Sequence, residues 1–118
     1  MWFDEKGKPI WPPKELYPDG ALTEPVKRVL EPGVLLDRYG TPKGNFVAPK
    51  GTPYEMRSLP PGAEKGEYHI YEVVKPVETW ESVVAPWFGE VGLGTQYKFE
   101  KTIEQLVKEG YLREVKRP

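Results

Sequence analysis

Hydrophobic and polar residues alternate most clearly between Tyr68 and Val74, and this alternation predicts a β-strand. One predicted face carries Tyr68, Ile70, Glu72 and Val74, and the other carries His69, Tyr71 and Val73. Neither face is polar throughout, so we expect the rest of the protein to cover both of them at least in part.

Four further segments, which contain many β-branched and aromatic residues, are predicted to be strands. They span residues 34–39, 45–48, 78–84 and 111–115. Turn-forming residues separate the first two of these segments, and this arrangement indicates a hairpin. We expect the last segment to lie at an edge of the sheet.

Two short helices are also predicted. Residues 23–30 would form the first, with Thr23 as its cap and Pro25 confined to its first turn. Thr102 can cap the second, and Gly110 lies where that helix should end. Its apolar face would carry Ile103, Leu106 and Val107. Short, mostly antiparallel strands with one or two short helices predict a compact α+β domain.

The first 20 residues are predicted to be irregular, because their prolines favour turns and extended chain. Large aromatic side chains are usually buried, so we expect Trp2, Phe3 and Trp11 to form a flap that packs over the core. A proline-rich ligand for another domain is the alternative, although the segment is short and has no basic flank. We treat residues 1–118 as one domain with residues 1–20 as its flap.

The composition is typical of a folded domain with many turns. The 118 residues include 14 Pro and 12 Gly, which predicts short elements. Aromatic residues make up 13% of the chain and are spread along it, so we reject disorder as the meaning of the Pro and Gly content. The absence of Cys excludes disulfides, a thiol nucleophile and a thiolate metal site.

The charge pattern argues against several classes of partner. The net charge is −1, and the basic residues form no stripe of the kind that nucleic-acid-binding proteins carry. No apolar run approaches the roughly 18–20 residues that span a membrane, so we expect no membrane insertion. Residues 1–6 lack the basic-then-apolar order of a signal peptide.

Arg38 and Arg57 are candidates for binding an anion. Arg38 lies in an apolar predicted strand, where a permanent charge is costly unless an anionic group pairs with it. Asp37 is a poor partner for it, because successive residues of a strand point to opposite faces. Two arginines that reach one pocket suit a diphosphate, which each can bind through paired hydrogen bonds. Ordinary ion pairing with the carboxylates of the chain is the alternative.

The segment Gly92-Leu93-Gly94-Thr95-Gln96-Tyr97 is a candidate binding loop. Closely spaced glycines let a backbone approach a ligand, and Gln96 offers one acceptor and two donors. The segment lacks the lysine of a P-loop, and a tight turn that leads towards the last helix is the alternative.

Catalysis by histidine or serine has little support. His69 is the single histidine, which excludes two-histidine metal motifs, and a lone histidine in an apolar strand is more often structural. The chain has no Gly-x-Ser-x-Gly elbow, so serine hydrolysis is not expected.

Six groups of residues, taken in order along the chain, are similar to the motifs of a known family. They are Trp11-Pro12-Pro13 with Asp19-Gly20, Leu36-Asp37-Arg38-Tyr39-Gly40 with Gly44-Asn45-Phe46, Gly51-Thr52-Pro53-Tyr54 with Arg57-Ser58-Leu59-Pro60, Tyr68-His69-Ile70-Tyr71-Glu72-Val73, Pro86-Trp87-Phe88, and Gly92-Leu93-Gly94-Thr95-Gln96-Tyr97. In this order they resemble the tuberculosis necrotizing toxin (TNT) domain family, and the resemblance covers nearly the whole chain.

The resemblance implies a compact α+β fold and NAD(P)⁺ glycohydrolase activity, which cleaves the dinucleotide into nicotinamide and ADP-ribose. NAD or NADP is then the substrate, and no cofactor or metal is implied. The resemblance also implies a toxin or effector domain that is secreted or delivered into a target cell as part of a larger protein. A cognate immunity protein is the expected protein partner.

The resemblance also implies the site residues. Arg38 and Gln96 are the expected catalytic residues. The expected substrate-binding residues are Arg57, Phe46, His69, Trp87, Phe88 and Thr95. Where a toxin of that family has a functional tyrosine, this chain has Phe46. Its ring can still stack on nicotinamide, but the hydroxyl is absent.

Two alternatives stay open. The same scaffold could carry out ADP-ribosyl transfer or cyclisation, although the chain has no Glu-x-Glu pair of the kind that transferases often use. The missing hydroxyl at Phe46 favours a catalytically impaired domain that binds NAD or a protein partner.

Overall fold

Seven strands form one antiparallel sheet in the computed structural model, which describes residues 2–12 and 20–116. In chain order they are β1 (Val26–Leu30), β2 (Leu35–Tyr39), β3 (Phe46–Pro49), β4 (Tyr68–Val73), β5 (Val77–Val83), β6 (Thr95–Lys98) and β7 (Leu112–Val115). The order across the sheet is β1-β5-β6-β3-β2-β4-β7, and every neighbouring pair is antiparallel.

The helical elements are short. The α-helix of the described residues is α1 (Ile103–Lys108), and two 3₁₀ turns, η2 (Tyr54–Met56) and η3 (Ala63–Lys65), lie between β3 and β4. The α+β fold class is therefore confirmed. Within the described part of the chain, no helix is long and apolar enough to cross a membrane.

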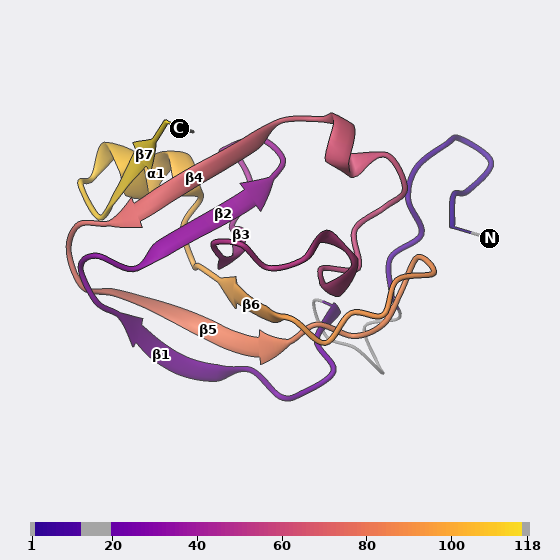
Figure 1. Ribbon diagram of the computed structural model, residues 1–118, viewed down its shortest axis with the longest axis horizontal. Coiled ribbons are helices and arrows are strands. Elements are labelled where there is room, and N and C mark those ends of the chain that lie inside the picture. Colours follow the sequence, from indigo (N-terminus) through magenta and orange to yellow (C-terminus); the bar gives the residue numbers. More distant parts are fainter. Residues whose placement is uncertain (1, 13–19, 117–118) are drawn as a thin grey trace.

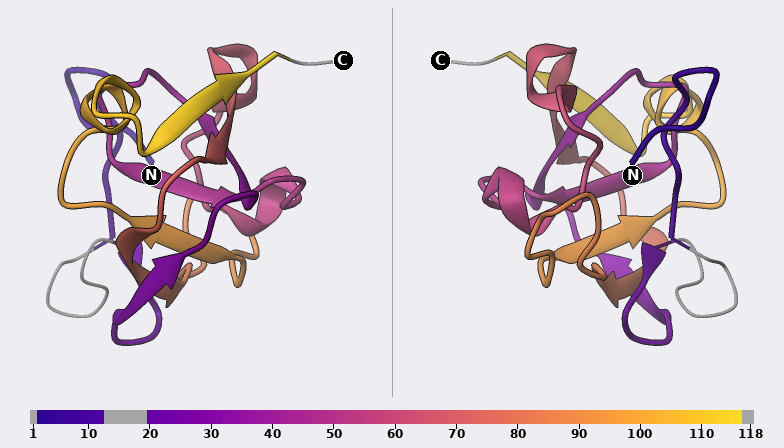
Figure 2. Two further views of the ribbon diagram at one scale, coloured as in Figure 1. Left: turned by 90° about the vertical axis from the view of Figure 1, so that its left-hand side faces the viewer. Right: turned by 90° about the vertical axis from the view of Figure 1, so that its right-hand side faces the viewer.

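Strand β3 joins two halves of the sheet. Figure 1 shows β2, β4 and β7 in its upper half and β1, β5 and β6 in its lower half. Figure 2 shows the same separation from two sides, with β7 and α1 in yellow above β6 in orange. On β3, Ala48 pairs with Asp37 of β2, and Val47 pairs with Tyr97 of β6. This short strand therefore brings β2 and β6 to either side of itself.

The predicted strands over residues 34–39, 45–48, 68–74, 78–84 and 111–115 are confirmed within one or two residues at each end. The hairpin between β2 and β3 is confirmed, and β7 lies at an edge of the sheet as expected. The strand over Thr95–Lys98 is an addition, because the sequence indicated a loop there.

The predicted helix over residues 23–30 is wrong, because residues 26–30 form the edge strand β1. Backbone pairing with β5 provides hydrogen bonds for this segment, and its valines suit a strand better than a helix. An ion pair across the two strands, between Lys27 Nζ and Glu78 Oε2 at 3.3 Å, adds to the pairing. Tertiary pairing overrides the local helical spacing here.

The core is filled by apolar side chains from both halves of the sheet and from α1. Its buried members are Leu30, Leu36, Val47, Tyr71, Val73, Val77, Phe99, Ile103, Leu106 and Leu112. The predicted cap of α1 at Thr102 is confirmed, and it is part of a capping box in which the side chains of Thr102 and Gln105 accept from each other's backbone N–H groups. The first turn of α1 also docks on the β2–β3 turn, where Ile103 N donates to Gly44 O at 3.0 Å.

The N-terminal segment, residues 2–12, packs against the loop after β5. The ring of Trp2 packs edge-on against the rings of Trp87 and Phe88, with 5.5 and 5.8 Å between ring centres. Trp11 packs in the same way on Phe88, with 5.4 Å between ring centres. Trp87 Nε1 donates to Ile10 O at 2.7 Å. The sequence places further flap residues at 13–19, which lie outside the described residues.

Two neighbouring leucines of β2 test this description of the core. Leu36 is fully buried, whereas Leu35 is 41% exposed. We expect Leu36→Ala to lower the free energy of unfolding by about 2–5 kcal/mol, because it removes packed methyl groups and leaves a cavity. Leu35→Ala should cost about 1 kcal/mol or less. Urea unfolding measures both, and equal losses would contradict the assignment of faces.

Candidate active site

One cleft of about 500 Å³ collects residues from segments that are far apart in the sequence. Its volume lies in the range of roughly 300–1,000 Å³ that is usual for small-molecule sites. Its walls come from the N-terminal segment, β2, β3, β6 and the chain after η2. Among the lining residues are Trp11, Arg38, Tyr39, Phe46, Arg57 and Gln96.

A narrow hollow of about 70 Å³ adjoins this cleft. Arg38, Phe46, Arg57 and Gln96 line both spaces, and Thr95 lines the hollow. The structure thus brings together five of the residues predicted to form the site.

A buried ion pair between Asp37 and Arg57 lies at the base of the site. Arg57 Nη1 is 2.7 Å from Asp37 Oδ1, and the two side chains are 8% and 0% exposed. The other carboxylate oxygen, Oδ2, accepts hydrogen bonds from the Tyr68 hydroxyl at 2.6 Å and from Gly51 N at 3.1 Å. Burial and the hydrogen bond to Asp37 raise the pKa of Tyr68 to about 12, so this hydroxyl stays protonated as a donor.

The Arg57 guanidinium is held by several contacts, and these contacts do not use all of its N–H donors. Its Nε and Nη2 both donate to Thr52 O, at 3.1 and 2.8 Å, and its guanidinium lies 4.9 Å from the centre of the Tyr39 ring. A guanidinium has five N–H groups, and two of those of Arg57 donate to Thr52 O, while Nη1 forms the ion pair with Asp37. Not all of its N–H groups are used by these contacts, and Arg57 lines the cleft.

Arg38 points away from Asp37, as strand alternation requires, and bonds to the turn that follows its strand. Its Nε donates to Thr41 O at 2.8 Å and its Nη1 to Phe46 O at 3.0 Å. A Cβ atom on Gly44 would lie 2.1 Å from Arg38 Nη2, so a side chain at this position would displace the Arg38 guanidinium. Within the described residues, the hydrogen bonds of Arg38 go to backbone carbonyls, and burial lowers the pKa of Arg38 from its ordinary value. Arg38 positions Phe46 through the carbonyl of that residue.

Gln96 lies on β6 at the cleft, and its amide is oriented by β5. Its Nε2 donates to Ser82 Oγ at 3.1 Å, and Ser82 is the cross-strand partner of Gln96. Ser82 is buried, so the amide is held by a side chain that the core keeps in place.

The glycines before Gln96 approach protein backbone rather than an open ligand space. Gly94 N donates to Met56 O at 3.1 Å, and a Cβ atom on Gly94 would lie 2.8 Å from the same oxygen. A Cβ atom on Gly92 would lie 2.9 Å from the backbone of Ala85. The close approach of these glycines therefore joins β6 to the η2 turn, directly before Arg57.

His69, Trp87 and Phe88 are not brought to the cleft. His69 Nδ1 lies 2.7 Å from Glu114 Oε2, and its Nε2 lies 3.5 Å from Glu67 Oε1. Trp87 and Phe88 pack instead on the N-terminal segment, where Phe88 is buried. The sequence motifs that contain these three residues do not indicate which neighbour each ring contacts in the fold.

Sequence reasoning did not identify Asp37, Tyr39 and Trp11 as site residues. Alternation along β2 could have placed Asp37 and Tyr39 on one face, opposite to Arg38. In the sequence, the alternation along residues 34–39 served only as an argument against Asp37 as a partner of Arg38. The position of Trp11 depends on contacts between segments that are far apart in the chain.

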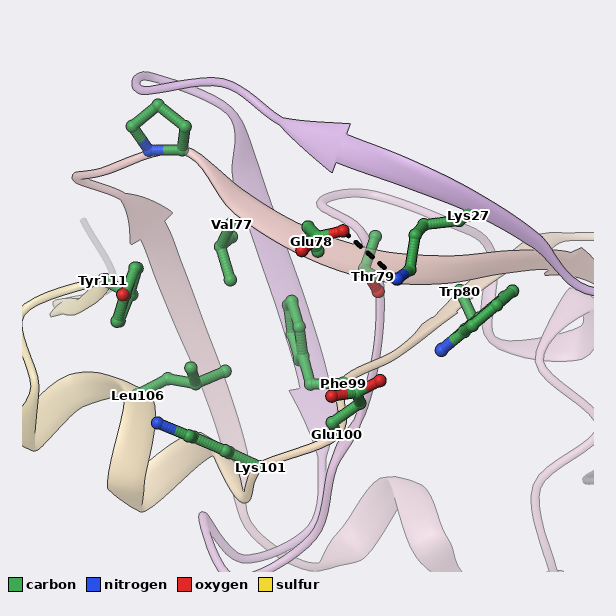
Figure 3. Close-up of a pocket in the computed structure, with 11 residues that line it drawn as sticks. Lys27, Val77, Glu78, Thr79, Trp80, Phe99, Glu100, Lys101, Leu106 and Tyr111 are labelled. Carbon is green, nitrogen blue, oxygen red and sulfur yellow. Dashed lines mark ion pairs between the residues drawn. The ribbon is translucent and has the colours of Figure 1, made fainter.

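A second hollow, of about 240 Å³, lies away from these residues. Figure 3 shows Val77, Phe99, Leu106 and Tyr111 inside it and the Lys27–Glu78 ion pair at its rim. None of the predicted site residues lines it. Among the described residues, no group of three or more His, Cys, Asp or Glu side chains could hold a metal ion.

A comparison of the sequence with protein families decides what the chain is related to. The family model described as Tuberculosis necrotizing toxin matches residues 29–115. The chain belongs to the tuberculosis necrotizing toxin family. The matched range contains all the candidate site residues except Trp11, which lies before it.

A named relative of this TNT-family chain is the conidial surface nicotinamide adenine dinucleotide glycohydrolase nadA of Aspergillus fumigatus. The two are 36% identical over an alignment of 116 residues, and the match covers 91% of this chain and 50% of the relative. The chain therefore spans about half the length of that protein.

Solved structures share the fold of this TNT-family chain. Tuberculosis necrotizing toxin, solved with its immunity factor, superimposes with a TM-score of 0.70 at 24% identity, covering 94% of this chain and 65% of that one. Rhs1-CT, solved with its cognate immunity protein, gives a TM-score of 0.59 at 15% identity and covers 83% of this chain and 82% of its own. At these identities the likeness establishes the fold alone.

The buried ion pair makes a prediction about stability. Asp37→Ala leaves the Arg57 charge buried without its carboxylate, so we expect a loss of about 3–5 kcal/mol in the free energy of unfolding. Glu78→Ala is the matched control, because its ion pair with Lys27 is exposed and should contribute about 1 kcal/mol or less. Urea unfolding compares them, and a small loss for Asp37→Ala would contradict the role of the pair.

The contact between His69 and Glu114 predicts that stability depends on pH. The hydrogen bond with Glu114 raises the pKa of His69 above its ordinary value of 6.5, against the lowering effect of burial. Its contribution to stability should therefore be fully present below about pH 6.5 and be lost as the pH rises through the folded-state pKa. Glu114→Gln should lower this pKa. An NMR titration of the single imidazole measures it, and an unchanged pKa in the variant would contradict the pairing.

Proposed function

We propose that this chain is an NAD(P)⁺ glycohydrolase, which cleaves the bond between nicotinamide and ribose to give nicotinamide and ADP-ribose. The observation that carries the proposal is the convergence of Arg57, Phe46 and Gln96 in one cleft, from separate segments of the chain. The name of the Aspergillus relative, a nicotinamide adenine dinucleotide glycohydrolase, supports the choice of substrate.

The chemistry needs positioning more than a strong acid. Nicotinamide leaves as a neutral molecule from a cationic ring and takes the electron pair of the C–N bond with it. The ribosyl carbon that remains has oxocarbenium-like character, as in glycoside hydrolysis. Water then adds to this carbon and releases one proton, so the products are nicotinamide, ADP-ribose and H⁺.

Arg57 is assigned to the diphosphate. Because Asp37 balances its charge, Arg57 would act mainly through the N–H groups that do not bond to Thr52, in an orientation that Thr52 and Asp37 fix. Arg38 also lines the cleft and has donors beyond the two that the turn uses. A guanidinium with a fixed orientation binds phosphate oxygens with little loss of side-chain entropy.

Phe46 and Gln96 are assigned to the reacting end. Phe46 would stack on the nicotinamide ring, and without a hydroxyl it makes no hydrogen bond there. Thr95 lies beside Gln96 at the narrow hollow and would contact the same end of the substrate. The Gln96 amide, oriented by Ser82, would align the ribose hydroxyls and the attacking water. Because the amide is neutral, it can do this without forming a tight ion pair with the substrate.

The toxin character of the family suggests a biological setting. We propose that the chain works as a toxin or effector domain, secreted or delivered into a target cell, with an immunity protein as its partner. Two solved relatives of this fold are complexes of that kind.

The second candidate is a catalytically impaired domain that binds NAD or a protein partner. Phe46 is the residue that favours it, because it lacks the hydroxyl of the tyrosine that a toxin of the family has at this position. Calorimetric binding of NAD by the protein without release of nicotinamide would decide for this function.

Gln96 provides the test of activity. The wild-type domain should release nicotinamide from a fluorescent etheno-NAD substrate, and Gln96→Ala should lower kcat by about 100-fold or more while the fold survives. Gln105→Ala is the matched control, because the only other glutamine lies on α1 at the far end of the molecule from the N-terminal segment (Figure 1).

The outcomes separate the functions. No cleavage of NAD by the wild-type domain at micromolar concentration would sink the glycohydrolase proposal. Product masses distinguish hydrolysis, which gives free ADP-ribose, from transfer to a protein or from cyclisation. Equal loss of kcat in the Gln96 and Gln105 variants would show that Gln96 has no special role.

A further inference from the structure

The two ends of the cleft differ in shape and composition. The narrow hollow contains Gln96, Thr95 and Phe46. The opposite, wider part is lined by Trp11 and Pro12 of the N-terminal segment together with Pro60 and Ala63. Trp11 lines only the wide part and Thr95 only the hollow, whereas Arg57, Tyr39, Phe46 and Gln96 line both spaces.

Trp11 is exposed and yet held in place. It is 58% exposed, although large aromatic side chains are normally buried. Its ring contacts the ring of Phe88 at 5.4 Å with the planes at 85°, and Phe88 itself is only 3% exposed. The preceding residue, Ile10, is fixed through both backbone groups: its N donates to Trp2 O at 2.8 Å, and its O accepts from Trp87 Nε1 at 2.7 Å.

An indole that is positioned by the fold and left open at a cleft suits a planar ligand group. Aromatic side chains bind nucleic-acid bases by stacking, and a platform that is already ordered loses little entropy when the base arrives. In a dinucleotide, the diphosphate separates two planar rings. The cleft offers contacts for all three groups, because Phe46 and Arg57 line both the hollow and the wide part, whereas Trp11 lines only the wide part.

We propose that Trp11 stacks on the adenine ring of the substrate, and this inference rests on the proposed glycohydrolase function. Gln96 and Phe46 assign the nicotinamide riboside to the narrow hollow. The larger, bicyclic adenine then lies in the wide part of the cleft against Trp11. The substrate is thereby bound in one direction, with the scissile bond at Gln96.

The proposal also gives Trp87 and Phe88 a role. They do not line the cleft, and they are positioning residues that hold the N-terminal segment through the indole N–H and the ring contacts. The expected effect of these two residues on the substrate is therefore transmitted through Trp11.

A pair of substrates tests the proposal. NAD carries the adenosine half, and nicotinamide mononucleotide lacks it while keeping the scissile bond. Trp11→Ala should raise the KM for NAD about tenfold and leave its kcat within about twofold. For nicotinamide mononucleotide, kcat/KM should stay within about twofold of the wild-type value. Trp11→Phe, which keeps a stacking face, should retain most of the affinity for NAD.

Binding of the product provides a measurement that does not depend on turnover. Calorimetry should show that ADP-ribose, which contains the adenine, binds about tenfold more weakly to Trp11→Ala than to the wild-type domain. Ribose 5-phosphate, which lacks the adenine, should show no such difference.

The outcomes are distinct. If Trp11→Ala lowers kcat/KM equally for both nucleotides, or changes neither them nor ADP-ribose binding, the assignment of adenine to Trp11 is overturned. If the wild-type domain binds ADP-ribose in a Trp11-dependent way but cleaves no NAD, the proposed activity fails and the adenine site stands.

Discussion

The site is organised around the buried ion pair between Asp37 and Arg57. A buried charge is tolerated only when its partner and its hydrogen bonds are held in good geometry. Asp37 meets this condition through β2, Tyr68 of β4 and the backbone after β3, and Arg57 meets it through Thr52. The pair thereby ties the chain after η2 to the upper half of the sheet. It also fixes the orientation of the Arg57 guanidinium beside the cleft.

Glycine contacts hold the remaining parts of the site to this pair. Gly94 allows β6 to approach the carbonyl of Met56, so Gln96 and Arg57 belong to one packed unit. Gly44 leaves room for the Arg38 guanidinium, which in turn bonds to the carbonyl of Phe46. Donors that are fixed before the substrate arrives need no rearrangement during the reaction. This preorganisation provides much of the catalytic effect of such sites.

The strands with clear alternation were predictable from the sequence, because half-buried strands leave a period of two in the chain. The edge strand β1 was not, since its helical spacing of valines was decided by pairing with β5. The convergence of Arg38, Arg57 and Gln96 followed from the family resemblance. Tertiary packing makes Asp37 the partner of Arg57. It also decides the contacts that keep His69, Trp87 and Phe88 away from the cleft. Short sequence segments do not encode such packing.

A crystal structure of the Gln96→Ala variant with NAD tests the central claim most directly, because this variant should bind the dinucleotide and cleave it at least about 100-fold more slowly. The account predicts a diphosphate within hydrogen-bond distance of Arg57 and a nicotinamide ring against Phe46. The ribose carbon that carries the nicotinamide should face position 96. A dinucleotide bound outside the cleft, or one whose diphosphate lies away from Arg57, would contradict it.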